Sequence, residues 1–167
     1  MNLPRKIDDV TALQAALAIL VVATATIAGA WIFESFGYLP CELCLKQRWA
    51  YYAGVPLAAA VLAAAWAGSR PATSLGLLLL ALLWIASSVF GVFHAGVEWG
   101  FWQGPTDCTG ALTKAPSVND FLQQLQTVKV VRCDAVAIRI LGLSLAGWNA
   151  VISAAMAAAA IVGMRAK

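Results

Sequence analysis

The sequence is poor in charged residues. Only 11% of its 167 residues are charged, whereas soluble globular domains average about 25%. Hydrophobic residues make up 62%, and the mean hydropathy is +0.81. This deficit, with its long runs free of charge, excludes an ordinary soluble domain and predicts a membrane protein. The net charge of +3 forms no basic stripe, so nucleic acid is not expected as a partner.

Four apolar segments are long enough to cross a lipid bilayer, which takes about 20 helical residues. They cover residues 11–33, 48–66, 72–93 and 141–164. We therefore expect an all-α membrane protein, a four-helix bundle that forms one domain over residues 1–167, with outer loops at 34–47 and 94–140. The first segment resembles a signal peptide, because the basic residues Arg5 and Lys6 precede its apolar run. Its apolar run exceeds the usual length of about 7–15 residues, so we expect an uncleaved anchor.

Basic residues in the short connections indicate the orientation in the membrane. They are Arg5 and Lys6 at the N-terminus, Arg70 between the second and third segments, and Arg165 and Lys167 at the C-terminus. With four spans, these three regions share one side, which the positive-inside rule makes the cytoplasm. All four cysteines are then expected on the opposite, periplasmic side of a bacterial inner membrane.

The four cysteines fall into two pairs. Cys41 and Cys44 form a C-x-x-C motif in the first outer loop, and Cys108 and Cys133 lie in the second. An even number on an oxidising face indicates two disulfides, although four cysteines allow three connectivities. C-x-x-C also occurs in zinc sites, but a four-thiolate zinc centre normally uses two such motifs. Cys108 and Cys133 are about 25 residues apart, so the spacing favours a redox relay, and we expect no metal.

The first pair is placed for chemistry rather than for stability, because a disulfide that closes so short a loop stabilises little. Pro40 and the apolar run after it predict a helix that starts around Cys44. The helix dipole and unpaired N–H groups there favour a thiolate. Gln47 and Arg48 follow three and four residues later on the same face. Arg48 would hold an anion or polarise a carbonyl near Cys44. Taken alone, Arg48 also fits an interfacial anchor.

His94 is the only histidine and closes the third segment at the depth expected for Arg48. It is therefore a candidate second polar contact for a ligand at the membrane surface, although alone it also fits a solvated histidine at the end of a span. Glu98, four residues later, could orient the ring.

The long outer loop carries its own signals. Ser117 followed by Asp120 is a variant of the capping box, and the apolar residues after it predict a short amphipathic helix, either on the membrane surface or within the loop. Cys108 lies between turn-forming residues in "GPTDCTG", where its thiol should be exposed to another protein.

Together these motifs resemble the DsbB family, the four-span disulfide-bond formation proteins of bacterial inner membranes. The resemblance rests on "PCELCLKQRWAYY", "FGVFHAGVEWG", "DCTG" and "VRCDAVAIRILGLSLAGWN", in that order, and covers nearly the whole chain. It implies a quinone-dependent protein-disulfide oxidoreductase. Such an enzyme reoxidises a DsbA-like periplasmic thioredoxin-fold protein and passes two electrons to a membrane quinone, either ubiquinone or menaquinone.

The resemblance also implies roles for the cysteines. Cys108 would form the mixed disulfide with the DsbA-like partner, and Cys133 would pair with it. Cys41 and Cys44 would exchange with that outer pair, and Cys44 would face the quinone.

For the quinone site, Arg48 matches the family's arginine, and His94 falls at a quinone-proximal position. Gln47 stands where some members carry Glu, and Ile138 stands where many carry Trp.

Two alternatives remain open. A DsbB-like paralogue would serve a specialised partner, and a non-catalytic tetraspan membrane protein would carry two inert structural disulfides. A vitamin K epoxide reductase-type protein is disfavoured because its C-x-x-C normally follows the loop cysteines, whereas here it precedes them.

Overall fold

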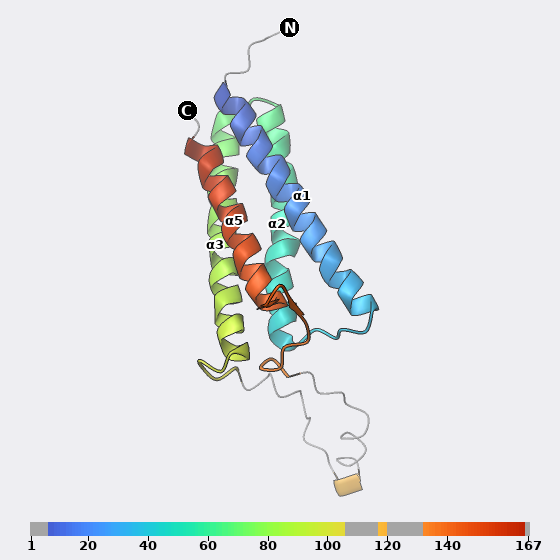
Figure 1. Cartoon of the computed structure of the whole chain (residues 1–167). Coiled ribbons are helices and arrows are strands. Elements are labelled where there is room, and N and C mark those ends of the chain that lie inside the picture. Colours follow the sequence, from blue (N-terminus) through green and yellow to red (C-terminus); the bar gives the residue numbers. More distant parts are fainter. Residues whose placement is uncertain (1–6, 106–116, 120–131, 166–167) are drawn as a thin grey trace.

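A computed structural model describes residues 7–105, 117–119 and 132–165 (Figure 1). Its elements are α1 (Ile7–Ser35), α2 (Glu42–Trp66), α3 (Arg70–Glu98), β1 (Arg139–Ile140), β2 (Leu143–Ser144) and α5 (Leu145–Arg165). The helices run up and down, so that α1 starts and α5 ends at one end of the bundle (Figure 1). At the other end α2 starts and α3 ends. This is the predicted four-helix architecture.

Within the described residues, four helices are long and apolar enough to cross a membrane: α1, α2, α3 and α5. The shortest, α5, has 21 residues. At about 1.5 Å per residue it reaches about 31 Å, which matches the hydrocarbon thickness. Large apolar side chains such as Leu75, Leu82 and Val89 lie exposed on the outside of α3. Because lipid tails are as apolar as leucine, this exposed surface suits a lipid environment.

The helices depart from the predicted segments mainly at the end where α2 begins. α2 starts at Glu42 rather than at residue 48, and α3 continues to Glu98 rather than 93. Hydropathy marks only the part of a helix inside hydrocarbon, whereas these helices extend beyond it with polar turns. Residues 141–144, predicted as the start of the last span, lie in a β-hairpin instead. Leu141 and Gly142 there have positive φ values of 52° and 85°, which no α-helix accommodates.

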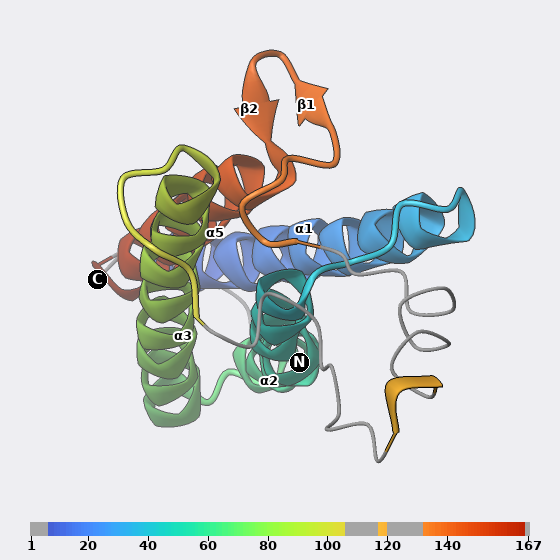
Figure 2. The same ribbon diagram turned by 90° about the horizontal axis from the view of Figure 1, so that it is seen from below.

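The hairpin leads directly into α5. β1 and β2 are antiparallel, with Arg139 opposite Ser144. The Ser144 hydroxyl accepts the Gly147 N–H at 3.1 Å, and the Trp148 indole N–H donates to the Ile140 carbonyl at 2.9 Å. Seen from below, the hairpin projects to one side of the helices, and α1 runs away from α3 (Figure 2). The predicted amphipathic helix after Ser117 lies largely outside the described residues.

α3 ends in a Schellman motif. Gly100, at φ +75°, donates its N–H to Val97 O at 3.1 Å, and the next N–H donates to Gly96 O at 2.9 Å. Glycine reaches this left-handed conformation without the strain of a side chain. The turn folds Trp102 back onto α3, where its indole N–H donates to Phe93 O at 2.8 Å. This contact fixes the last turns of α3, which carry His94.

Small and polar residues hold the helices together inside the bundle. α3 lies directly against α5 at Gly91, where an added Cβ would stand 2.9 Å from the Ala150 backbone nitrogen. The Tyr51 hydroxyl of α2 donates to Asn149 Oδ1 of α5 at 2.5 Å. Close backbone approach and interhelical hydrogen bonds are the usual links between helices in lipid, where the hydrophobic effect does not drive association.

Candidate active site

Two free thiols stand at the N-terminus of α2. Cys41 is the N-cap residue, with extended backbone (φ −77°, ψ 172°), and its Sγ accepts the Cys44 backbone N–H at 3.3 Å. The two Sγ atoms lie 3.0 Å apart. Since the helix begins at Glu42, the unpaired N–H groups and the positive end of its dipole favour negative charge on Cys41. The sequence had placed this effect at Cys44, because it placed the helix start there.

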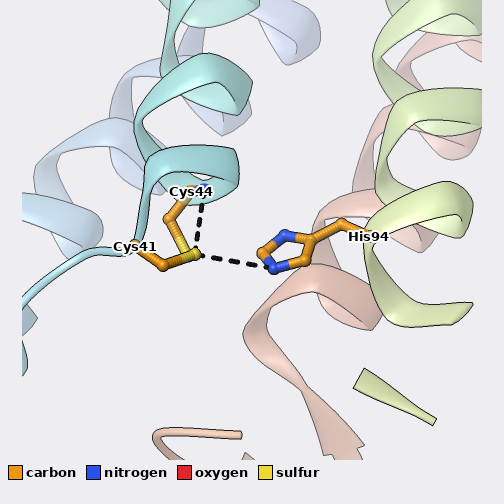
Figure 3. A group of neighbouring side chains, drawn as sticks. All are labelled: Cys41, Cys44 and His94. Atoms are coloured by element: carbon orange, nitrogen blue, oxygen red, sulfur yellow. Dashed lines mark hydrogen bonds between the residues drawn. The ribbon is translucent and has the colours of Figure 1, made fainter. Parts of the chain in front are cut away.

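His94 reaches the cysteine pair from α3. Its Nε2 lies 3.6 Å from Cys41 Sγ, and the residue is only 1% exposed. The ring extends from the last turns of α3 toward the two sulfurs at the first turn of α2 (Figure 3). His94 is therefore a buried neighbour of the thiols, and the alternative of a solvated histidine is wrong.

Gln47 holds the other side of the imidazole. Its amide nitrogen lies 3.0 Å from His94 Nδ1, and the Gln47 side chain is buried in the same interface between α2 and α3. When the amide donates to Nδ1, the neutral ring carries its proton on Nε2 and donates toward Cys41. Gln47, His94 and Cys41 thus form a continuous polar chain.

This surrounding lowers the pKa of the Cys41 thiol from 9.0 to about 4. The main cause is a hydrogen bond from the Cys44 thiol; the His94 ring and the Cys44 backbone N–H add to it, while burial acts in the opposite direction. In the reduced pair, Cys41 is the thiolate and Cys44 holds the shared proton. The site can therefore present a nucleophilic sulfur at neutral pH.

Cys133 packs into the same cluster. The buried side chains Cys41, Leu43, Val97 and Cys133 form one apolar group, with Cys133 1% exposed. Cys133 takes part in a disulfide, and because Cys41 and Cys44 are free, its partner lies outside the described residues. Cys108, predicted as that partner, is outside the described residues. We call this end of the bundle, which holds Cys41, Cys44 and Cys133, the cysteine end.

Arg48 points toward α1. Its guanidinium donates to the Glu34 carboxylate at 2.6 Å and to the Ala30 carbonyl at 3.5 Å. The guanidinium side chain is 12% exposed and the Glu34 side chain 41%. Among the described residues, Glu34 and Ala30 are the polar partners of Arg48. Gln47 faces α3 instead, so Arg48 lies in the interface between α1 and α2 and Gln47 in the interface between α2 and α3. The sequence did not single out Glu34; its place seven residues before Cys41, at the end of an apolar span, was the available signal.

Glu98 does not orient the histidine, as the sequence had suggested, because Gln47 and Cys41 take both ring nitrogens of His94. Its Oε2 atom is buried without a hydrogen-bond partner within the described part of the chain. Asp134, which follows Cys133 in the chain, pairs with Arg132 at 2.5 Å on the surface. The Arg132 guanidinium lowers the pKa of this exposed carboxylate.

The family model described as "Disulfide bond formation protein DsbB" matches residues 12–163. The chain belongs to this family. It is thus a multi-pass membrane protein of a disulfide-forming, thiol-oxidoreductase family, as its motifs had indicated. The match includes all four cysteines, Gln47, Arg48 and His94.

One curated relative is the uncharacterized protein RP370 of Rickettsia prowazekii (strain Madrid E). It is 24% identical over 140 residues, which cover 82% of this chain and 78% of the relative. No solved structure matches the chain. The DsbB assignment therefore rests on the family match and on the motifs.

Proposed function

We propose that this chain is a quinone-dependent thiol oxidase that reoxidises a DsbA-like periplasmic dithiol. Electrons pass through Cys108 and Cys133, then Cys41 and Cys44, to a membrane quinone, either ubiquinone or menaquinone. The observation that carries the proposal is the shared buried cluster of Cys41 and Cys133 at one end of a four-span bundle. Cysteines from two separate segments belong to one buried cluster there, and exchange between two pairs requires such proximity.

This packing supports the following thiol steps. A partner thiolate attacks Cys108, which forms a mixed disulfide and releases Cys133 as a thiolate. The partner's second thiolate then displaces Cys108, and the partner leaves oxidised. The Cys133 thiolate then attacks Cys41 Sγ of an oxidised Cys41–Cys44 pair, that S–S bond breaks, and Cys44 departs as a thiolate. Cys108 completes the exchange by displacing Cys41, which re-forms the outer disulfide. The Cys41 and Cys44 dithiol then loses two electrons and two protons and becomes a disulfide again.

The stabilised thiolate at Cys41 suits the last step of this exchange. A thiol with a lowered pKa is a good leaving group, and Cys41 is the group that Cys108 displaces from Cys133. His94 Nε2–H and the Cys44 backbone N–H hold the negative charge that appears on Cys41. Gln47 keeps the ring in the tautomer that donates.

The residues at the cysteine end fit a quinone, which is flat and carries two carbonyl oxygens. The donors expected for it are the N–H groups of the Arg48 guanidinium beyond those bonded to Glu34 and Ala30, and the His94 Nε2–H when it turns from Cys41 Sγ. On the α1 and α2 surface, Trp31 and Tyr52 stack at 6.4 Å, and Trp49 is exposed beside Arg48. When bound, the quinone supplies an acceptor for two electrons and two protons. A DsbA-type protein is a strong oxidant at about −120 mV, so its reoxidation requires such an acceptor.

The charge distribution favours a periplasmic cysteine end. Arg70 at the start of α3 and Arg165 in the last turn of α5 lie at the opposite end of the bundle (Figure 1). The positive-inside rule makes that end cytoplasmic, together with both termini. The thiols would then face the compartment in which disulfides form.

The test is quinone reduction by the purified protein in detergent, supplied with a reduced DsbA-type partner. The proposal predicts that quinone is consumed in step with partner oxidation and that Cys44→Ser abolishes both. A folded wild-type protein that turns over neither ubiquinone nor menaquinone would point to a specialised partner or to structural disulfides instead.

A further inference from the structure

The cysteine end presents three side chains that zinc prefers as ligands. Cys41 Sγ, Cys44 Sγ and one ring nitrogen of His94 all lie within 4.8 Å of one another. Thiolate sulfur and imidazole nitrogen are the usual ligands of Zn²⁺ in proteins. The sequence alone did not predict a metal, because only a four-cysteine site was considered and the position of His94 beside the C-x-x-C motif depends on how α3 packs.

The distances match tetrahedral coordination closely. Zinc bonds of about 2.3 Å to sulfur and about 2.0–2.1 Å to nitrogen place S and N ligands about 3.6 Å apart, and two sulfurs about 3.8 Å apart. Cys41 Sγ and His94 Nε2 are already 3.6 Å apart. The two sulfurs, at 3.0 Å, need to separate by about 0.8 Å, which a small rotation of the Cys44 side chain provides.

Gln47 supplies the supporting contact that a metal-bound histidine needs. A histidine ligand usually donates its second N–H to a carbonyl or carboxylate oxygen. The Gln47 amide lies 3.0 Å from His94 Nδ1. If the amide turns over, Oε1 accepts the Nδ1 proton and Nε2 is freed to bind a cation. Gln47 can thus support His94 both when the ring donates to Cys41 and when the ring binds a cation.

Charge also favours a divalent cation here. Two thiolates buried side by side repel each other and lose hydration, so the reduced pair keeps one proton. A divalent cation that replaces this one proton leaves the centre of two thiolates and a neutral histidine electrically neutral. Cys41 and His94 are almost fully buried, and neutralisation matters most at such positions.

We propose that the reduced Cys41 and Cys44 pair, together with His94, binds one Zn²⁺ and leaves a fourth position open for water. Binding releases the one proton that the reduced pair holds. When the two thiolates lose two electrons and form the disulfide, no thiolate remains and the cation departs. The site therefore exists only in the reduced state.

Zinc and disulfide formation then compete for the same sulfurs. While both sulfurs are ligands they cannot form a disulfide, so Zn²⁺ would hold the protein in its reduced state. This inhibition rests on the proposed function, whereas the binding itself needs neither a quinone nor a partner protein.

Co²⁺ is a suitable probe, because it occupies zinc sites and, unlike Zn²⁺, has visible bands. Full-length protein in detergent, carrying Cys108→Ser and Cys133→Ser so that the outer thiols cannot contribute, would be reduced and titrated with Co²⁺. The expected result is one Co²⁺ per chain, with thiolate-to-cobalt charge-transfer bands and the intense bands of tetrahedral cobalt. One equivalent of Zn²⁺ should displace it. The same sample with Cys41 and Cys44 oxidised is the matched control and should bind none.

Variants then test the histidine ligand and the Gln47 side chain that contacts it. His94→Ala should weaken binding by at least about tenfold and abolish the tetrahedral spectrum, and Gln47→Leu should weaken it by about 10–100-fold. Glu42→Gln, an exposed neighbour in the first turn of α2, should change nothing. The proposed site would be refuted if the reduced protein bound no Co²⁺, if the oxidised protein bound Co²⁺ equally well, or if His94→Ala bound Co²⁺ as tightly as the parent protein. A protein that binds Co²⁺ as expected but never reduces quinone would refute the proposed function and leave the site standing.

Discussion

At the residue scale, the chemistry is concentrated in the chain from Gln47 through His94 to Cys41. Each ring nitrogen of the histidine has one defined partner, at 3.0 Å to Gln47 and 3.6 Å to Cys41 Sγ. The Cys44 thiol and its backbone N–H complete the surroundings of Cys41. Negative charge on one sulfur is therefore stabilised by donors from two helices.

The first prediction concerns the pH dependence of that thiolate. Because the pKa of Cys41 is lowered from 9.0 to about 4, the reduced protein should retain one thiolate down to about pH 4. The stabilisation that this thiolate gives to the folded reduced protein is fully present above about pH 9 and is lost as the pH falls toward 4. Thiolate ultraviolet absorbance against pH, in the Cys108→Ser, Cys133→Ser background, checks this. A single step near pH 9 would contradict it.

The second prediction ranks the causes of the shift. The Cys44 hydrogen bond is the largest contribution and the His94 hydrogen bond is smaller. Cys44→Ala should therefore raise the pKa of Cys41 more than His94→Leu does, and both should raise it. The same titration measures both variants, and Glu42→Gln serves as a control for a change of charge in the first turn. A larger effect of His94→Leu would show that the histidine, not Cys44, dominates.

These side chains were only partly predictable. Both cysteine pairs, Arg48 and His94 were recognisable as candidates, because polar and ionisable side chains at the edge of apolar spans are costly and commonly serve a function. Their partners were not, because contacts between α2 and α3 or α1 depend on how each helix is rotated about its axis. Gln47 thus turned out to contact His94, and Arg48 turned out to contact Glu34.

At the scale of elements, the contact between α3 and α5 holds the cysteine end in place. α3 carries His94 and Val97, and it lies against α5 without a side chain between the two backbones at Gly91. Ser88 of α3 also donates to the Ala150 carbonyl at 2.9 Å. A change at this contact should therefore affect the whole bundle.

The third prediction is that Gly91→Ala destabilises the protein by about 1–3 kcal/mol, the usual cost of overpacking. The added Cβ would meet Ala150 backbone atoms at 2.9 Å and 3.0 Å, and backbone inside a helix cannot easily move aside. Gly29→Ala in α1 is the matched control, since nothing lies within 4 Å of its Cβ position. It should be neutral or stabilising by up to about 1 kcal/mol. Thermal unfolding in detergent compares the two, and equal losses would contradict this prediction.

The helices themselves were largely predictable, whereas the residues at which α2 begins and α3 ends, at the cysteine end, were not. Long apolar runs identify spans because only helices satisfy backbone groups in lipid without a partner strand. The turns of α2 that carry Cys44 and Gln47, and the last turn of α3 after His94, contain polar residues that hydropathy assigns to loops. The short β1–β2 hairpin has too few residues for any alternation pattern to reveal it.

At the scale of the whole molecule, the four spans place sulfurs from distant segments against one another. Cys41 and Cys133, separated by two complete spans, share one buried cluster, and the basic residues Arg70 and Arg165 lie at the opposite end of the bundle. The sequence predicted both cysteine pairs at one end from the spans and the basic residues, but it did not predict that Cys41 and Cys133 share a buried cluster. We propose that electrons from the outer pair reach the quinone only through Cys41 and Cys44.

Counting electrons tests that claim most directly. Protein with all four thiols reduced would be mixed with ubiquinone in lipid nanodiscs without oxygen, and the quinone consumed per chain would be measured. The relay predicts two quinones per chain for the wild type, one for the Cys108→Ser, Cys133→Ser variant, and none for Cys41→Ser, Cys44→Ser. Quinone reduction that persists without Cys41 and Cys44, or no reduction by the folded wild type, would contradict it.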